Sequence, residues 1–382
     1  MLHLQKHLTL SFPRQWLLAI TRFATTASAA ASPDPAPFTV EDYLVASCHL
    51  NQDQALKASK ALSHLTSPTN PDAVLALLSG LGLSPPDIAA VVVRDPKLLC
   101  CKVDKRHGFS TRLAALQRHG FSTSEIARLV LLSPSSFRRR AIISKLKYYV
   151  PFFGSFDDLL NALKKRSSLL GADLEGVVKP NVSCLREFGL GELEIAKICR
   201  KVPSLLSARP ERVQAMVVRA EAMGVPRSSP MFKYALQCVA SLNDEFITAK
   251  VEFLKETFRW SEADVRFAVS RDPWVLTVSK DRASRVSKFL ISEVGLDPEY
   301  IACTPALIKY SLVRRLIPRH YVVKFLKANG LLGHDRSYYS AVQVSEKAFM
   351  EKFICPYKEA APHLAEDYAA ACRGEVPSRF RL

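Results

Sequence analysis

The chain lacks any apolar run long enough to cross a membrane. A membrane helix needs roughly 18 consecutive apolar residues, and the best candidate, from Val74 to Leu83, is interrupted by Ser79, Gly80 and Gly82. Glycine is scarce, at 14 of 382 residues, while hydrophobic residues make up 48% and charged residues 23%. That composition is typical of a globular protein rather than a disordered one. We therefore expect a soluble, folded protein with no membrane-spanning segment.

The sequence also lacks the motifs of the common catalytic and metal sites. It contains no Walker loop, no GxGxxG, no HExxH and no nucleophile elbow. The nine cysteines include no CxxC pair and no neighbouring His pair at zinc spacing. An odd number of cysteines without a disulfide framework suits a reducing compartment. We expect buried free thiols, no cofactor, no metal and no enzymatic activity.

Acidic residues are absent from the first 33 positions. This segment holds three spaced bases, Lys6, Arg14 and Arg22, and a stretch rich in Ser, Thr and Ala from Thr25 to Ser32. Such a composition is typical of an organellar transit peptide. It predicts import into the mitochondrion, with the chloroplast as the alternative; a tail without a targeting function is the other interpretation. Three prolines between Ser32 and Pro37 mark a hinge to the folded part.

Positive charge is in excess. The chain has 53 Lys and Arg against 36 Asp and Glu, a formal net charge of +17. Without the three bases of the N-terminal segment, 50 remain against 36, an excess of 14. Basic side chains that neutralise phosphates release counterions, so this charge favours a nucleic-acid partner. Anionic lipid surfaces and acidic proteins attract such a chain too, and a merely basic protein needs no such partner.

One register of residues returns about every 35 positions. Counted from Gly82, Ser84 stands at +2, Asp87 at +5, Ile88 at +6 and Pro96 at +14. A pair of apolar residues follows the proline. The repeats begin at positions 82, 120, 153, 189, 224, 259 and 295, and position 330 opens a weak final copy. A fixed period of this length predicts an all-α fold, a helical-repeat solenoid of about 35-residue units.

The register has a physical explanation at each position. Ser at +2 with Asp or Glu at +5 forms a capping box, which satisfies the free amide groups at the start of a helix. Proline at +14 cannot continue that helix, so the apolar pair after it packs from a new direction. Each repeat is predicted to contain a first helix, a glycine break, a capped second helix and a proline stop.

Three repeats depart from the register. Ser167 replaces the stop proline in the repeat that begins at Phe153, and the repeat from Gly224 has Cys238 at that position. The repeat from Gly295 has Pro305 four residues early, as if one helical turn were deleted. We expect residues 34–71 to form a linker and N-terminal capping helices, residues 72–330 the repeats, and residues 331–382 a C-terminal repeat or cap with a tail.

These residues resemble the mTERF family, the mitochondrial transcription termination factor repeats of the land-plant type. The unit with a central proline and an apolar pair is similar, as are the segments Tyr43–Cys48 and Ala55–Lys60. So is the tail with Phe349, Phe353, Tyr357, Pro362, Leu364 and Tyr368. The resemblance covers about residues 38–370. It implies a curved stack of helical triplets whose basic path binds double-stranded DNA, or RNA, in organelle transcription, termination or intron splicing.

The candidate contacts to nucleic acid are basic residues at repeated positions. Position +12, two before the proline, is basic in four of the five well-registered repeats: Arg94, Lys165, Lys201 and Arg271. The other candidates follow the stop position: Arg138, Arg139, Arg140, Arg282, Arg314 and Arg315. They belong to longer basic runs that include Lys145, Lys309 and Arg319. The alternative is that these bases complement helix dipoles, with Asp95 and Asp272 pairing with their Arg neighbours.

Aromatic residues offer a second kind of contact. Trp260, Trp274, Tyr148 and Tyr149 could stack on bases, but we expect them to pack between repeats.

The expected function is that of a nucleic-acid binder that acts as a monomer, with or without organellar protein partners. Two other functions compete with it. One is a helical scaffold whose surface holds other proteins. The other is a pentatricopeptide-like RNA binder, which the proline stop disfavours.

Overall fold

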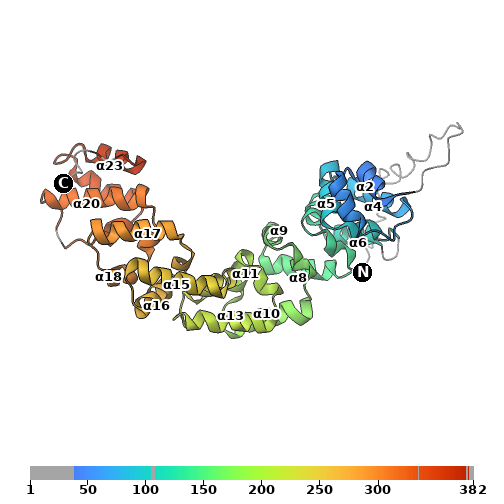
Figure 1. Cartoon of the computed structure of the whole chain (residues 1–382), viewed down its shortest axis with the longest axis horizontal. Coiled ribbons are helices and arrows are strands. Elements are labelled where there is room, and N and C mark those ends of the chain that lie inside the picture. The colour runs from blue at the N-terminus through green and yellow to red at the C-terminus, as the bar shows by residue number, and fades with distance from the viewer. Residues whose placement is uncertain (1–37, 105–107, 334, 376, 378–382) are drawn as a thin grey trace, which may run out of the picture. The chain divides into compact units, whose positions relative to one another are not determined.

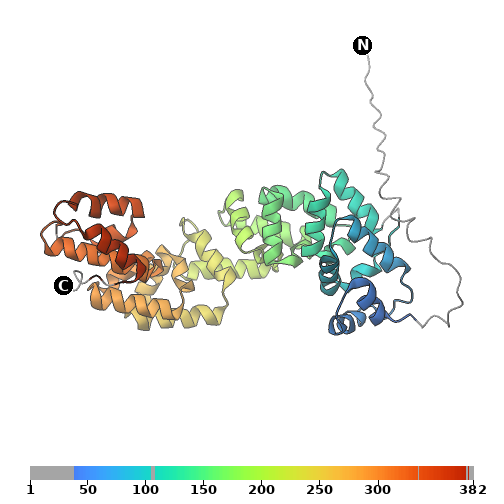
Figure 2. The same cartoon turned by 90° about the horizontal axis from the view of Figure 1, so that it is seen from above.

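The computed structural model describes residues 38–104, 108–333, 335–375 and 377, and over these ranges the chain is helical with no strand (Figures 1 and 2). The predicted all-α class is confirmed. The predicted transit peptide lies outside the described residues. The helices form two compact parts, an N-terminal part that ends at Val178 and a C-terminal part that begins at Lys179.

Each regular repeat consists of a first helix, a second helix and a short third helix. The first helices are α4 (Thr69–Gly80), α6 (Phe109–Arg118), α8 (Ile142–Phe153), α10 (Lys179–Glu187), α13 (Pro210–Ala222), α15 (Asp244–Phe258), α17 (Lys280–Lys288) and α20 (Ile317–Ala328). The second helices are α5 (Pro85–Arg94), α7 (Thr123–Leu132), α9 (Phe156–Lys165), α11 (Glu192–Lys201), α14 (Phe232–Ser241), α16 (Glu262–Arg271), α18 (Pro298–Cys303) and α21 (Tyr338–Gln343).

The short third helices contain the pair of residues that follows the stop position, which is apolar except for Ser136 in η2. They are η1 (Pro96–Cys100), η2 (Pro134–Arg138), η3 (Ser167–Gly171), α12 (Ser204–Ser207), η5 (Pro273–Thr277) and α19 (Ala306–Lys309). The pair is fully buried, as at Leu205 and Leu206. Burying each such leucine stabilises the fold by about 1.5–3 kcal/mol. The triplet implied by the resemblance is therefore present in the described chain.

Short π-helical turns extend several first helices. The segments η4 (Leu174–Val178) and η7 (Leu312–Leu316) run directly into α10 and α20, and η6 (Phe289–Glu293) follows α17. Ahead of the first repeat lie α2 (Val40–Cys48) and α3 (Gln52–Ser59), which pack on each other and on α5. The Tyr43 hydroxyl donates a 2.6 Å hydrogen bond to the Asp72 carboxylate, which ties α2 to α4.

The predicted capping boxes begin the second helices. Ser84 and Asp87, Ser122 and Glu125, and Ser261 and Asp264 exchange side-chain and backbone hydrogen bonds in both directions. In the repeat from 153, Ser155 Oγ accepts from the Asp158 amide at 3.1 Å. These local bonds fix where each second helix starts.

The second helices that are followed by a short third helix end in a similar backbone conformation, with or without proline. The residue before the stop position has φ −146° and ψ 82° at Asp95, which precedes a proline, and φ −146° and ψ 86° at Arg166, which precedes Ser167. Helix α9 therefore ends at Lys165 and η3 follows as in the proline-containing repeats. The missing proline does not alter the local fold of this repeat.

The other two irregular repeats do differ in structure. In the repeat from Gly224, α14 runs past Cys238 to Ser241, and α15 begins three residues later without a short third helix. Cysteine keeps its amide proton, so it continues a helix that proline would end. In the repeat from Gly295, α18 has six residues where α16 has ten. The deleted turn was predicted correctly.

The break between first and second helix has a left-handed residue. In the third repeat the left-handed residue is Gly154, with φ 92°, one residue after the predicted origin at Phe153, whereas the cap Ser155 and the helix end Lys165 keep the predicted register. The expected glycine is replaced by Arg259 in another repeat, where φ is 57°. A left-handed backbone costs a non-glycine residue roughly 1–2 kcal/mol, so packing on either side must impose it.

The C-terminal end forms its own hydrophobic cluster. After α21 come α22 (Glu346–Phe349), the π-helical η8 (Met350–Ile354), η9 (Cys355–Tyr357) and α23 (Leu364–Arg373). Helix α23 packs on α20, beside which it lies in Figure 1. Phe349, Phe353, Leu364 and Tyr368 are buried there with Val322 and Leu326 of α20. These apolar contacts close the end of the C-terminal part.

Candidate nucleic-acid interface

Four of the predicted contact residues lie at equivalent places. Arg94, Lys165, Lys201 and Arg271 are the last residues of α5, α9, α11 and α16, and all four side chains are exposed. Each therefore adds a positive charge at the C-terminal end of a second helix. This position favours cations through the helix dipole as well as through any bound phosphate.

Arg94 and Arg271 also make contacts within the protein that involve a neighbouring helix end or ring. Arg94 Nη1 donates to the carbonyls of Leu131 and Leu132, at 3.2 Å for the latter, so it caps the end of α7 in the next repeat. The Arg271 guanidinium lies over the Phe267 ring, 5.2 Å from its centroid. Arg94 and Arg271 therefore each combine an exposed charge with a contact that stabilises the fold.

The acids beside these arginines do not pair with them. Asp95 accepts a hydrogen bond from Arg138 Nε at 2.7 Å, and Asp272 forms an ion pair with Lys309 Nζ. Both partners belong to the following repeat. The expectation that Asp95 and Asp272 pair with their own Arg neighbours was wrong, because the carboxylates turn toward the short helix of the next repeat.

The consecutive basic residues Arg138, Arg139 and Arg140 have three different environments. Arg138 is bonded to Asp95, and Arg139 Nη1 donates to the Gly171 carbonyl at 3.2 Å. Arg140 is exposed and makes no hydrogen bond or ion pair with the residues that the structure describes. Of the three, Arg140 has all its donors available to a ligand.

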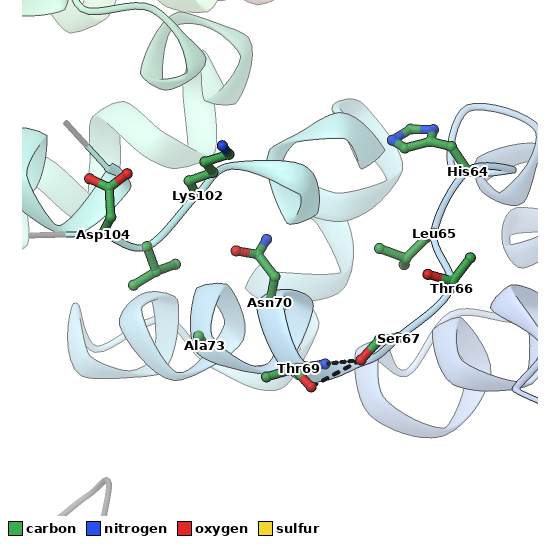
Figure 3. A pocket seen from close by; sticks show the side chains of 10 residues that line it. His64, Leu65, Thr66, Ser67, Thr69, Asn70, Ala73, Lys102 and Asp104 are labelled. Atoms are coloured by element: carbon green, nitrogen blue, oxygen red, sulfur yellow. Dashed lines mark hydrogen bonds between the residues drawn. The ribbon is translucent and has the colours of Figure 1, made fainter.

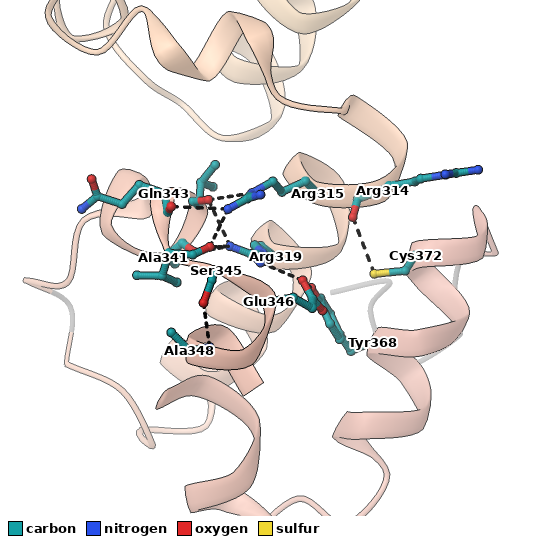
Figure 4. A network of polar contacts seen from close by, with 12 residues as sticks. Arg314, Arg315, Arg319, Ala341, Gln343, Ser345, Glu346, Ala348, Tyr368 and Cys372 are labelled. Atoms are coloured by element: carbon teal, nitrogen blue, oxygen red, sulfur yellow. Dashed lines mark hydrogen bonds and ion pairs between the residues drawn. The ribbon is translucent and has the colours of Figure 1, made fainter. Parts of the chain in front are cut away.

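The remaining candidates lie near the last repeats. Arg282 Nη2 donates to the Lys309 carbonyl, and Arg315 Nε donates to the Val342 carbonyl at 2.8 Å while its guanidinium stacks on Tyr310. The exposed Arg314 side chain extends away from this network in Figure 4. Arg314 is therefore the candidate of this group that projects into solvent.

Polar side chains of four first helices, three of them buried and Asn70 half-buried, have a structural role that the repeat register did not reveal. Each binds carbonyls at the end of its own repeat's short third helix: Asn70 Nδ2 to Leu99 O at 2.8 Å, Lys145 Nζ to Leu170 O at 2.7 Å, Asn181 Nδ2 to Ala208 O at 2.8 Å, and Lys250 Nζ to Val278 O. Burial lowers the pKa of Lys145 and Lys250. The signal in the sequence is a polar residue on the apolar face of a first helix.

The same kind of bond is most extensive at Arg319. This fully buried guanidinium donates to the carbonyls of Ala341, Val342 and Val344, at 3.0, 3.0 and 2.8 Å, and pairs with Glu346 at 2.8 Å (Figure 4). Lys145 and Arg319 were included in the basic runs that suggested a nucleic-acid path. Both are buried, so neither adds to the exposed charge.

The aromatic candidates are packing residues rather than exposed platforms. Trp260 is buried, stacks on Phe258 at 4.7 Å, and donates from Nε1 to the Pro298 carbonyl of the next repeat. Tyr149 is fully buried. Tyr148 and Trp274 are half-buried. Packing between repeats, as expected from the sequence, is confirmed for Trp260.

A pocket of about 580 Å³ lies near the start of the repeats (Figure 3). Its wall includes His64, Thr66, Asn70 and Lys102, and His64 Nε2 lies 3.5 Å from Cys100 Sγ at its edge. Burial raises the pKa of the Cys100 thiol, which opposes formation of a nucleophilic thiolate.

The described ranges contain neither a metal-ligand cluster nor a helix suited to span a membrane. No group of three or more His, Cys, Asp or Glu residues there could hold a metal ion. No described helix is both long and apolar enough to span a bilayer. All nine cysteines are free thiols, as predicted, but only Cys48, Cys184, Cys199 and Cys238 are buried.

The fold and the register define an all-helical repeat protein built from triplets of about 35 residues, with cations at the ends of its second helices. The chain belongs to the mTERF family, whose model matches residues 55–350. It is 19% identical over 254 residues to the mitochondrial transcription termination factor MTERF15 of Arabidopsis thaliana. That alignment covers 66% of this chain and 56% of the relative, so the chain spans just over half of the relative's length.

Proposed function

We propose that the chain binds nucleic acid and regulates gene expression in an organelle, by transcription termination or by RNA processing. Double-stranded DNA is the proposed ligand, and RNA is the alternative. Membership in the mTERF family and the name of the Arabidopsis relative, a transcription termination factor, support this function. The observation that carries it is the exposed cation that ends four second helices, Arg94, Lys165, Lys201 and Arg271.

The proposed mechanism of binding is phosphate neutralisation. Four exposed cations are candidates for phosphate contacts: Lys165 and Lys201 end second helices, Arg140 follows η2, and Arg314 lies in η7. Contacts from such side chains position a nucleic acid and supply affinity that salt reduces. They carry no base readout, so a preference for one sequence needs further contacts or a partner protein.

Charge reversal at two of these cations tests the proposal. The full chain carrying Lys201→Glu and Arg314→Glu is compared with wild type in filter binding to duplex DNA and to single-stranded RNA. We expect the affinity to fall at least about tenfold, because two phosphate contacts become repulsions. The control, Lys352→Glu with Lys358→Glu, makes the same change in net charge at exposed sites outside the repeats. Equal affinity of both double variants would reject a basic binding path.

A protein-binding scaffold remains the second candidate, and exposed apolar side chains favour it. Leu193 is 77% exposed and Val218 60% exposed, both on helices of the C-terminal part. For this function, reversing Arg138, Arg139 and Arg140 together leaves nucleic-acid affinity unchanged. A large loss of affinity in that variant favours the nucleic-acid binder.

The mitochondrion is the proposed location, with the chloroplast as the alternative. The acid-free first 33 residues and the mitochondrial designation of the relative support it. A fluorescent fusion of the full chain, imaged with markers of both organelles, tests the location. A monomer is the proposed state in solution, and sedimentation of the purified chain tests it.

A further inference from the structure

Two repeats far apart in the chain share a tripeptide at the end of the second helix. Arg94-Asp95-Pro96 ends α5 and Arg271-Asp272-Pro273 ends α16. Both aspartates are buried, each residue being 7% exposed. A buried carboxylate needs a charged or hydrogen-bonding partner, and in both repeats the charged partner comes from the next repeat. Asp272 Oδ1 also accepts from the Trp274 amide of its own repeat at 3.2 Å.

We call the contact between each aspartate and the cation of the next repeat a joint. The cation occupies the same place in both joints. Arg138 is the last residue of η2, and Lys309 is the last residue of α19. Arg138 Nε donates to Asp95 Oδ2 at 2.7 Å, and Lys309 Nζ pairs with Asp272 Oδ2. The same bond thus forms between neighbouring repeats in the N-terminal part and in the C-terminal part.

In each pair the acid is covered and the base is partly open to solvent. The Asp95 and Asp272 side chains are each 10% exposed, whereas those of Arg138 and Lys309 are 39% and 37% exposed. A guanidinium has five N–H donors and an ammonium three, so one bond to the carboxylate leaves others for a second partner. The second partner would have to be an acceptor at the surface.

Further cations surround the two joints. Arg139 and Arg140 follow Arg138, and Arg282 donates to the Lys309 carbonyl. Cations therefore outnumber the single aspartate at each joint, so an anion that reaches the joint meets a net positive charge. This arrangement differs from an exposed surface pair, in which acid and base are equally available to solvent.

We infer that Asp95 and Asp272 are positioning residues for phosphate: each holds the cation of the next repeat in place for the backbone of a bound nucleic acid. The inference rests on the proposed function. A free Arg or Lys side chain loses rotamer freedom when it binds, and a side chain already held by a carboxylate loses less. The covered carboxylate is farther from the ligand than its cation is, so its repulsion of a phosphate is the smaller effect.

A double-mutant cycle on the full chain tests the inference. Affinity for a random-sequence DNA duplex is measured for wild type, Asp95→Ala, Arg138→Ala and the double variant, each over a salt series. We expect Asp95→Ala to weaken binding about three- to tenfold when Arg138 is present and to have no effect when it is absent. Arg138→Ala should also make the negative slope of log affinity against log salt shallower by about one. Asp95→Ala should keep that slope, because the cation remains.

Asp157→Ala is the matched control. Asp157 also pairs with an arginine of the neighbouring repeat, Arg128 at 2.8 Å, but both side chains are well exposed. Its loss should not change nucleic-acid affinity. The pair Asp272→Ala and Lys309→Ala repeats the cycle, and keeps the test decisive if Asp95→Ala does not fold.

The outcomes separate this inference from the proposed function. Wild type without salt-dependent binding would reject the proposed function itself. Normal binding by wild type, together with unchanged or tighter binding by Asp95→Ala and Asp272→Ala, would overturn the positioning role alone. So would a loss of affinity that is the same with and without Arg138, because that is the result of a purely structural joint.

Discussion

At the scale of single residues, Arg319 joins three segments of the C-terminal end. Its guanidinium is completely buried between α20 and the turn after α21, and it also stacks on Phe349, 4.4 Å from the ring centroid. Three backbone carbonyls accept its hydrogen bonds. An acceptor that is buried and loses its donor costs roughly 1–3 kcal/mol.

Replacing Arg319 with methionine should therefore be strongly destabilising. Methionine fills a similar space but donates no hydrogen bond, so we expect a loss of about 3 kcal/mol and faster hydrogen exchange in α20 to α23. Arg373→Met is the matched control, since Arg373 lies on α23 with an exposed side chain. Thermal unfolding and exchange mass spectrometry measure the effect. Similar melting temperatures for both variants would contradict the role given to Arg319.

The half-buried His320 predicts a pH dependence. Its ring packs against Phe289, Tyr321 and Tyr338 at 5.6–6.0 Å, and burial, with a smaller contribution from Lys324, lowers its pKa from 6.5 to about 4. Between these two values the unfolded chain binds a proton that the folded chain excludes. Stability should therefore fall as the pH drops from about 7 toward 4.

His320→Gln removes that titration. We expect wild type to lose up to about 2 kcal/mol more than the variant between pH 7 and pH 5, measured by urea unfolding. Exposed His363→Gln should behave as wild type. Parallel pH profiles for wild type and His320→Gln would show that another group controls the dependence.

At the scale of the helices, the glycine breaks offer a clean comparison. Gly189 has φ 88° and open space within 4 Å of the point where a methyl group would be added, whereas Gly171 has equal space without a positive φ. Gly189→Ala should cost about 1–2 kcal/mol through its backbone alone. Gly171→Ala should be neutral or slightly stabilising, because it restricts the unfolded chain. Melting temperatures of the two variants measure the difference, and equal values would contradict a backbone origin.

The helices also show why some features were predictable from the sequence. Capping boxes, the deleted turn in α18 and the left-handed glycines depend on residues within four positions of each other, so the pattern reveals them. The ties from Asn70, Lys145 and Asn181 join residues 25–31 positions apart. Their charge or polarity is visible in the sequence, but their direction depends on how the triplet closes.

The same reason limits prediction of the binding surface. Arg94 and Arg138 were chosen as exposed bases, and both make bonds to a neighbouring repeat. Arg140 and Arg314 look no different in the sequence and are exposed like them, yet their side chains make no hydrogen bond or ion pair with the described residues. Which exposed cations also bond within the protein is decided by contacts between repeats, which a one-dimensional register does not contain.

At the scale of the whole molecule, the excess of basic residues predicts a steep salt dependence. If about six exposed cations each neutralise one phosphate of duplex DNA, the slope of log affinity against log salt is about −5. Affinity should then fall roughly a thousandfold between about 50 and 200 mM salt. Equilibrium binding of the full chain at four salt concentrations measures the slope. A slope near zero would mean that phosphate contacts contribute little.

The helix stop at Arg166 has a consequence for how such proteins are found. Its backbone angles match those of Asp95 although serine, not proline, follows it. Proline is therefore not required for the turn in this repeat, although α14 continues past Cys238, where another repeat lacks the proline. A search that scores the proline would pass over the copy around residues 154–188, whereas one that scores the capped start and the buried apolar pair would count it. The length of a divergent array of this kind is better judged from its apolar periodicity than from its prolines.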